Sequence, residues 1–164
     1  MWRRVSLAPV GGSAMADVIE IAKATVTAYN NKNWNEMRGL LAADAVYDEK
    51  ATSRRLEGSG QIIEALEGWA QAFPDSKGTF IREFVSNDSV VLELIWKWKG
   101  VHTGPLQTPT GAIAASNKPI EVPACEIFQV EGGKVRSATH YFDMLTLLNQ
   151  IGVTGAAAPA KSAA

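Results

Sequence analysis

The hydrophobic periodicity of this chain changes once, after residue 74, from a helical spacing to a strand spacing. Before that point, apolar residues recur every three or four positions over residues 16–30 and 60–73, as they do on amphipathic helices. Beyond it, apolar and polar residues alternate over residues 90–99 and 120–130, as they do on half-buried strands. A block of helices followed by a block of strands is typical of an α+β fold, not of alternating βαβ units. The pattern therefore predicts helices on one face of a largely antiparallel sheet.

Capping and turn residues mark where the elements end. Asn33 is placed to cap a short second helix, and Pro74 ends the third helix. Glu131-Gly132-Gly133 predicts a hairpin turn into a last strand over residues 134–143. Gly152 can end a short terminal helix in the left-handed conformation. Residues 104–117, with several Thr, Pro and Gly turn clusters, predict a long loop.

The length of 164 residues fits one domain with a single core. Regular patterning begins near Met15 and ends near residue 153. We therefore expect a disordered extension over residues 1–13, one domain over residues 14–153 and a flexible tail over residues 154–164.

Charge and cysteine content narrow the class of protein. Sixteen basic against seventeen acidic residues argue against nucleic acid as a partner, because its binders carry a basic excess. The pairs Arg3-Arg4 and Arg54-Arg55 are expected to be solvated. The single cysteine, Cys125, excludes an intrachain disulfide and is typical of a reducing compartment. No stretch approaches the roughly 18–20 apolar residues that cross a bilayer, so we expect a cytoplasmic protein without a membrane partner.

The motifs of several common enzyme classes are missing from the sequence. It contains no phosphate-binding glycine loop, no dinucleotide fingerprint, no serine-hydrolase elbow and no zinc-protease helix. The two histidines, His102 and His140, lie on different predicted strands, so the sequence gives only weak support for a metal site. We expect neither a metal nor an organic cofactor.

Two polar residues occupy strand positions that otherwise face the core. His102 keeps the inward parity of Trp96 and Trp98 if the strand continues past Gly100. It is then either a hydrogen-bonded loop histidine or a donor to a substrate carbonyl or a proton shuttle. Glu126 shares the parity of apolar neighbours, and carboxylates are rarely buried without partners. It is either a pocket residue or part of a structural hydrogen bond.

Asp143 ends the last predicted strand and directly precedes the terminal helix. Asp is a preferred N-cap residue, which gives this side chain a structural role. The alternative is a carboxylate at the mouth of an apolar cavity, with a raised pKa suited to removing a proton next to a carbonyl. Spacing leaves both interpretations open.

Short motifs follow one another in a characteristic order along the chain. They are Tyr47-Asp48, Gly58, Ala72-Phe73-Pro74-Asp75, Gly100-Val101-His102-Thr103-Gly104-Pro105, Pro109-Thr110-Gly111, Glu126-Ile127-Phe128, Gly133-Lys134-Val135, His140-Tyr141-Phe142-Asp143 and Leu147-Leu148-Asn149-Gln150-Ile151-Gly152. In this order, over roughly residues 17–153, the chain resembles the SnoaL-like polyketide cyclase family of the NTF2-like, ketosteroid-isomerase-like superfamily. The resemblance implies a cone in which a curved sheet is wrapped by three N-terminal helices and followed by a short C-terminal helix.

The resemblance also implies a site. In characterised cyclases of the family, the Asp matching Asp143 is the general acid/base of an intramolecular aldol closure that uses no metal or organic cofactor. His102 would then polarise a carbonyl in the same pocket. A small hydrophobic ligand is expected to contact Glu126, His140, Tyr47, Asp48, Trp98, Trp96, Tyr141 and Phe73. Residues 49–57 lack the Pro-rich segment common in the family, which leaves the substrate open.

Two other functions remain open. A limonene-epoxide-hydrolase-like enzyme expects an Arg two positions before an acid on a strand, but Ala124 stands there before Glu126. The other is a non-catalytic ligand-binding or dimerising domain. The outer parity of the long strand would form the homodimer face through Val91, Glu93, Ile95, Lys97 and Lys99.

Overall fold

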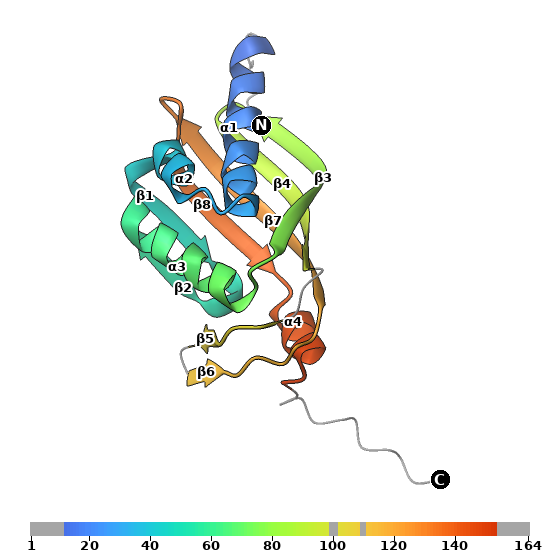
Figure 1. Ribbon diagram of the computed structural model, residues 1–164. Helices are drawn as coiled ribbons and strands as arrows, with labels where there is room; N and C mark the ends of the chain where they lie inside the picture. The colour runs from blue at the N-terminus through green and yellow to red at the C-terminus, as the bar shows by residue number, and fades with distance from the viewer. Residues whose placement is uncertain (1–11, 99–101, 109–110, 154–164) are drawn as a thin grey trace, which may run out of the picture.

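A curved six-stranded sheet with helices on one face makes up most of the structure (Figure 1). The structure, a computed structural model, describes residues 12–98, 102–108 and 111–153. In chain order its elements are α1 (Gly12–Asn30), α2 (Trp34–Leu40), β1 (Leu41–Glu49), the 3₁₀ helix η1 (Lys50–Thr52), β2 (Arg54–Glu57), α3 (Ser59–Ala72), β3 (Ser76–Ser86), β4 (Ser89–Trp98), β5 (Leu106–Thr108), β6 (Gly111–Ile113), β7 (Ile120–Glu131), β8 (Lys134–Phe142) and α4 (Met144–Ile151). The large sheet has the order β2-β1-β8-β7-β4-β3, and β5 pairs with β6 separately. β1 and β8 run parallel and the other neighbours in the large sheet run antiparallel, so the predicted α+β class is confirmed.

Helices α1, α2 and α3 cover one face of the large sheet (Figure 1), and α4 contacts β7. Local sequence sets their ends. The Asn33 side chain accepts a hydrogen bond from the backbone N–H of Glu36 at 3.2 Å, directly before α2. Ile62 and Ile63 of α3 are buried, as the helical spacing predicts. Gly152 ends α4 with a φ of 86°, which glycine adopts without strain.

The face of the sheet under the helices carries the buried side chains of the core. In β4, Val90, Leu92 and Leu94 are buried, whereas the residues between them are partly exposed. This alternation confirms the predicted inward side of the strand. The side chains of Trp96 and Trp98, expected to continue that side, lie outside the described residues.

The periodicity predicts neither β1 nor β2. Alternation in β1 is broken because Ala43 and Asp44 are both exposed, and its register against β8 shifts between Leu41 and Val46. β2 has only four residues. The three-residue strands β5 and β6 likewise lie within the segment expected to be a loop. Strands this short or irregular offer too few alternating positions for a period of two to be recognised.

The ends of the chain lie partly outside the described residues. α1 begins at Gly12, so the last two residues of the expected disordered extension are helical. Residues 1–11 and the expected tail from residue 154 are not among those the structure describes. In the described ranges, no helix combines the length and the apolar character needed to cross a membrane. The domain boundaries and the cytoplasmic location stay predictions.

Candidate active site

A cavity of about 70 Å³ lies between the helices and the inner face of the sheet. A buried site for one water molecule needs only about 10–15 Å³ by a comparable measure, so this space admits a small organic group. Its walls are mostly apolar and include the rings of Trp69, Phe128 and Phe142. Neither lysine nor arginine occurs among the described residues that line it. Its titratable groups come from Tyr29, Tyr47, Glu126 and His140.

Three of the buried polar side chains lie side by side across neighbouring strands. Glu126 of β7 is the register partner of His140 on β8, and His140 is the partner of Glu49 on β1. Partners in adjacent strands project to the same face of a sheet, here the inner one. Their relative exposures are 6%, 8% and 1%, respectively. The sheet therefore places a carboxyl, an imidazole and a second carboxyl in one buried row.

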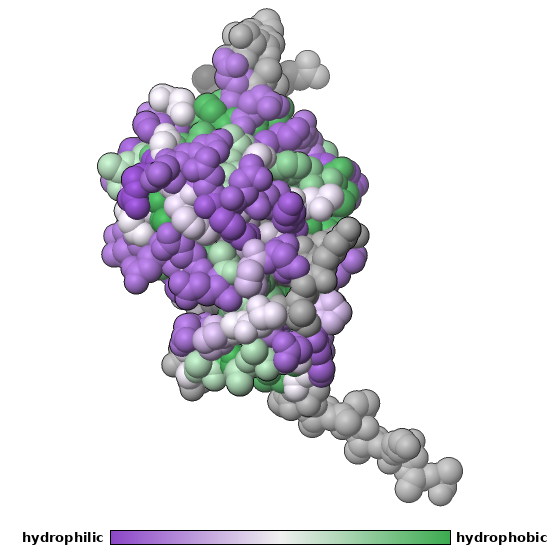
Figure 2. All heavy atoms as spheres, viewed as in Figure 1, coloured by the Kyte–Doolittle hydropathy of each residue, from purple (hydrophilic) through white to green (hydrophobic). Residues whose placement is uncertain are grey.

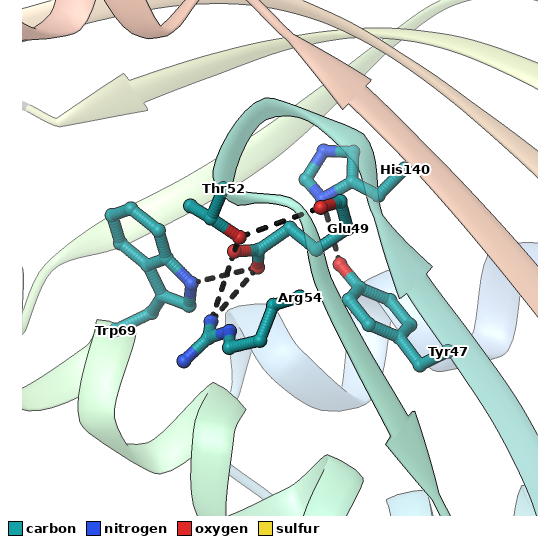
Figure 3. Close-up of polar contacts among 6 residues, drawn as sticks. All are labelled: Tyr47, Glu49, Thr52, Arg54, Trp69 and His140. Carbon is teal, nitrogen blue, oxygen red and sulfur yellow. Dashed lines mark hydrogen bonds and ion pairs between the residues drawn. The ribbon is translucent and has the colours of Figure 1, made fainter. Parts of the chain in front are cut away.

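The imidazole of His140 bridges two of the groups that line the cavity. Its Nδ1 lies 2.7 Å from the Tyr47 hydroxyl (Figure 3), and its Nε2 lies 3.4 Å from Oε1 of Glu126. A neutral imidazole donates through one nitrogen and accepts through the other. If the Tyr47 hydroxyl donates to Nδ1, the Nε2 proton therefore faces Glu126. The three side chains form a path along which a proton can be held or shifted.

Burial sets the protonation of this path. Burial, followed by the charge of Glu49, raises the pKa of Glu126 to about 8. Burial lowers the pKa of His140 to about 3 and raises the pKa of Tyr47 well above its ordinary value. At neutral pH, Glu126 is therefore mostly protonated, while His140 and Tyr47 are neutral. A carboxyl that titrates near neutral pH in an apolar cavity is suited to general acid/base chemistry.

Glu49 is held by three donors at the edge of this site (Figure 3). The Arg54 Nη2 group lies 3.0 Å from both carboxylate oxygens, and the Trp69 indole N–H donates to Oε2 at 3.0 Å. The Thr52 hydroxyl donates to Oε1. Arg54, expected to be solvated, is only partly so: its side chain is 36% exposed, and its guanidinium pairs with the buried carboxylate of Glu49. Arg55, its expected companion, is exposed.

Family comparison agrees with this architecture. The model of the SnoaL-like polyketide cyclase family matches residues 19–151. The chain belongs to this family. No curated protein matched the SnoaL-like chain.

Solved structures share the fold of this SnoaL-like chain. A provisionally assigned SnoaL-like polyketide cyclase from Jannaschia sp. CCS1 has a TM-score of 0.78 at 15% identity, covering 90% of this chain and 99% of its own. A provisionally assigned polyketide cyclase from Xanthomonas campestris has a TM-score of 0.73 at 19% identity, with coverages of 84% and 98%. A protein with a ketosteroid-isomerase-like fold from Catenulispora acidiphila, in complex with trimethylamine, has a TM-score of 0.67 at 23% identity, with coverages of 82% and 94%. At these identities the likeness shows the fold alone.

Asp143 of the SnoaL-like chain is not among the residues that line the cavity. Its carboxylate caps α4, accepting hydrogen bonds from the Thr146 backbone N–H at 2.9 Å and the Thr146 hydroxyl at 2.6 Å. The side chain is exposed, and these bonds, the hydroxyl first, lower the pKa of Asp143. The expected raised pKa is therefore wrong, because hydrogen bonds to the charged form outweigh desolvation. The capping interpretation is confirmed, and a catalytic role for Asp143 stays a prediction.

Replacing Asp143 with Ala should lower the Tm by about 2–4 °C, because an N-cap is lost. Asp143→Asn should cost less, since an Asn oxygen also accepts the N–H bond of a cap. Thermal unfolding followed by circular dichroism measures both changes. An equal loss in the two variants would contradict the capping role.

His102 also lies away from the cavity lining. β4 is described as far as Trp98, residues 99–101 lie outside the described residues, and His102 itself is not part of a strand. The ring is fully buried, stacks on Phe73 with centroids 4.9 Å apart, and accepts the backbone N–H of Ser116 at Nδ1 over 3.1 Å. Burial lowers its pKa, which keeps the ring neutral. The structure thus supports the hydrogen-bonded loop interpretation.

The remaining predicted ligand contacts fall into different places. Phe73 is buried beside the cavity, where it stacks on Trp69 with centroids 6.1 Å apart. Asp48 pairs with Lys50, and Tyr141 is 46% exposed. Neither Asp48 nor Tyr141 is part of the cavity lining. The cavity therefore brings together three of the predicted residues, Glu126, His140 and Tyr47.

The sequence prediction missed Glu49, and it also missed Tyr29 and Thr25, which line the cavity. Glu49 shares the parity of Ala45 and Tyr47, and all three are buried in β1. This alternation would have indicated an inward Glu49 if the segment had been assigned as a strand. Across residues 12–98, 102–108 and 111–153, no group of three or more His, Cys, Asp or Glu is placed to hold a metal ion.

Proposed function

We propose that this chain is a small enzyme of the cyclase or isomerase type that acts on a hydrophobic, carbonyl-bearing ligand through Glu126. The observation that carries the proposal is the Glu126 carboxyl, 6% exposed, which opens on an apolar cavity and faces Nε2 of His140. Membership in the SnoaL-like family supports the reaction class. Because Asp143 does not line the cavity and Glu126 does, we assign the acid/base role to Glu126.

The proposed step is a proton transfer next to a carbonyl. Ionised Glu126 takes a proton from the carbon beside the carbonyl, and the electron pair moves into an enolate. In an isomerisation, Glu126 returns the proton to another carbon of the same conjugated system. In a cyclisation, the enolate carbon attacks a second carbonyl of the ligand, and the resulting alkoxide takes the proton back. Both routes leave Glu126 as it began, and the step itself needs no oxidant or reductant.

His140 and Tyr47 act as positioning residues in this scheme. The Tyr47 hydroxyl holds the imidazole through Nδ1, and the imidazole fixes one oxygen of Glu126 through Nε2. The second carboxyl oxygen is then left for the ligand. The apolar walls exclude water, which strengthens each of these interactions.

Proton exchange tests the proposal without knowledge of the natural substrate. A panel of apolar ketones is incubated with the protein in D₂O, and loss of the proton signal beside the carbonyl is followed by NMR. We expect exchange with the native protein and its loss with Glu126→Gln. Binding without exchange would indicate a ligand-binding module. Diol formation from terpene epoxides would indicate a limonene-epoxide-hydrolase-like activity.

We also propose a homodimer formed through the outer face of the sheet. Phe84 is 59% exposed and Tyr141 is 46% exposed on this face, and both border a shallow hollow of about 500 Å³. Val91 and Glu93, predicted to face outward, line the same hollow. The face seen in Figure 2, on the side of the helices, is by contrast mostly hydrophilic. Exposed apolar side chains that cluster on one face are typical of an interaction site.

Replacing Phe84 with Glu should convert the dimer to a monomer, because it replaces an exposed apolar ring of the contact with a charge. Sedimentation-velocity centrifugation of the native protein and the variant measures the change. Glu57→Gln, at an exposed position of β2, is the control and should stay dimeric. A native protein that sediments as a monomer at all accessible concentrations would overturn the proposal.

A further inference from the structure

The row of polar residues continues over two more strands beyond Glu126 and His140. Arg54 on β2 is the register partner of Glu49, Glu49 is the partner of His140, and His140 is the partner of Glu126. The row therefore runs guanidinium, carboxylate, imidazole, carboxyl across β2, β1, β8 and β7. Leu92, the next partner on β4, is apolar and closes the row.

We propose that Glu49 is a positioning residue for the active site: its carboxylate, fixed by Arg54, Trp69 and Thr52, holds the proton on Glu126. This inference rests on the proposed acid/base role of Glu126. Glu49 does not line the cavity and acts on the ligand only through Glu126.

The contacts of Glu49 indicate a fixed charge. Its side chain is 1% exposed and accepts hydrogen bonds from Arg54, Trp69 and Thr52. A core built for stability alone has little need of such a group, because replacing a buried ion pair with apolar side chains is often neutral or stabilising. The three donors hold the negative charge of the Glu49 carboxylate at one place beside the active site. A Gln at this position would carry no charge.

The distance across the sheet determines the size of the effect. Neighbouring strands lie about 4.8 Å apart, so residues two strands apart on one row lie roughly 10 Å apart. Across that distance at an effective dielectric constant of about 20, one buried charge changes the proton affinity of the other group about tenfold, or about one pH unit. The direction agrees with the raised pKa of Glu126, for which the charge of Glu49 is the second cause after burial.

The other groups that face Glu126 do not supply this charge. Tyr29 on α1, Tyr47 on β1 and His140 on β8 are neutral at physiological pH, because burial raises the pKa of both phenols and lowers that of the imidazole. Arg54 on β2 carries the opposite charge but stands one strand farther from Glu126 than Glu49 does.

An infrared titration of Glu126 tests the proposal. The C=O band of the protonated Glu126 carboxyl is assigned by its loss in Glu126→Gln and is followed between pH 5 and 10. Glu49→Gln should move the midpoint to lower pH by about one unit. Glu49→Asp, which keeps the charge, should leave the midpoint within a few tenths of the native value. Glu57→Gln, the same substitution at an exposed position, should leave it unchanged.

The opposite results are equally well defined. A native midpoint in Glu49→Gln, or an equal shift in Glu49→Gln and Glu49→Asp, would show that the cluster is only structural. If Glu49→Gln does not fold, Glu49→Gln/Arg54→Gln removes both charges of the pair and should still lower the midpoint. The titration needs no substrate, so an unshifted midpoint in Glu49→Gln overturns only the role of Glu49. An unchanged rate of ketone proton exchange in Glu126→Gln overturns the proposed function.

Discussion

Replacing Glu126 with Gln should lower the rate of proton exchange by about 10²–10⁴-fold, the range that one general acid/base group contributes. The amide has nearly the shape of the carboxyl, so the apolar walls of the cavity stay in place. It can also keep the contact with Nε2 of His140, which lies 3.4 Å from Oε1 of Glu126 in the native protein. It cannot take or release the proton, however, and the loss should therefore appear in the rate and not in ligand binding. NMR exchange rates and ligand affinity measure the two effects separately.

Asp143→Asn is the matched control for this prediction. It is the same change from carboxylate to amide, made at the residue that the family resemblance favours, and Asn keeps a capping oxygen for Thr146. We expect this variant to retain a rate near that of the native protein. The reverse result, a normal rate in Glu126→Gln and a lost rate in Asp143→Asn, would return the acid/base role to Asp143.

The fold was predictable from sequence where patterns are local. The alternation of Val90, Leu92 and Leu94 gave the buried side of β4, and Asn33 and Gly152 gave the ends of α2 and α4. β1 and β2 were not predictable in this way. β1 pairs with β8, which lies about ninety positions later in the chain, and only that pairing makes its irregular sequence a strand.

The candidate site was predictable only in part, for the same reason. The alternation along β7 identified Glu126 as an inward-facing acid, because every second residue of a strand points to the same face of the sheet. The contact between Tyr47 and His140 depends on the parallel register of β1 and β8, which neither strand encodes alone. For Asp143 the sequence spacing allows both a helix cap and a catalytic carboxylate. Its hydrogen bonds to Thr146 show that it caps α4.

The free energy of unfolding should depend on pH, because the pKa values of the buried groups Glu126 and His140 are shifted in the folded protein. Burial, followed by the charge of Glu49, raises the pKa of Glu126 from 4.5 to about 8, so the folded state binds this proton more tightly. The resulting stabilisation is complete below about pH 4.5 and is lost as the pH rises to about 8. Burial lowers the pKa of His140 from 6.5 to about 3, so stability is gained as the pH rises between those values.

The slopes of Glu126 and His140 oppose each other between about pH 4.5 and 6.5, and there the lowered pKa of His102 adds a further rise of stability with pH. Between pH 6.5 and 8, Glu126 lies between its unfolded and folded pKa values, whereas the lowered pKa of Lys32, about 8, affects stability only at higher pH. At about 1.4 kcal/mol per pH unit, the free energy of unfolding should fall by about 2 kcal/mol between pH 6.5 and 8. Urea unfolding at pH 5.5, 6.5 and 8 measures this fall. Glu126→Gln removes the titrating group, so its stability should stay level over the same interval. A level profile in the native protein, or a fall that persists in Glu126→Gln, would show that Glu126 does not hold its proton in the folded state.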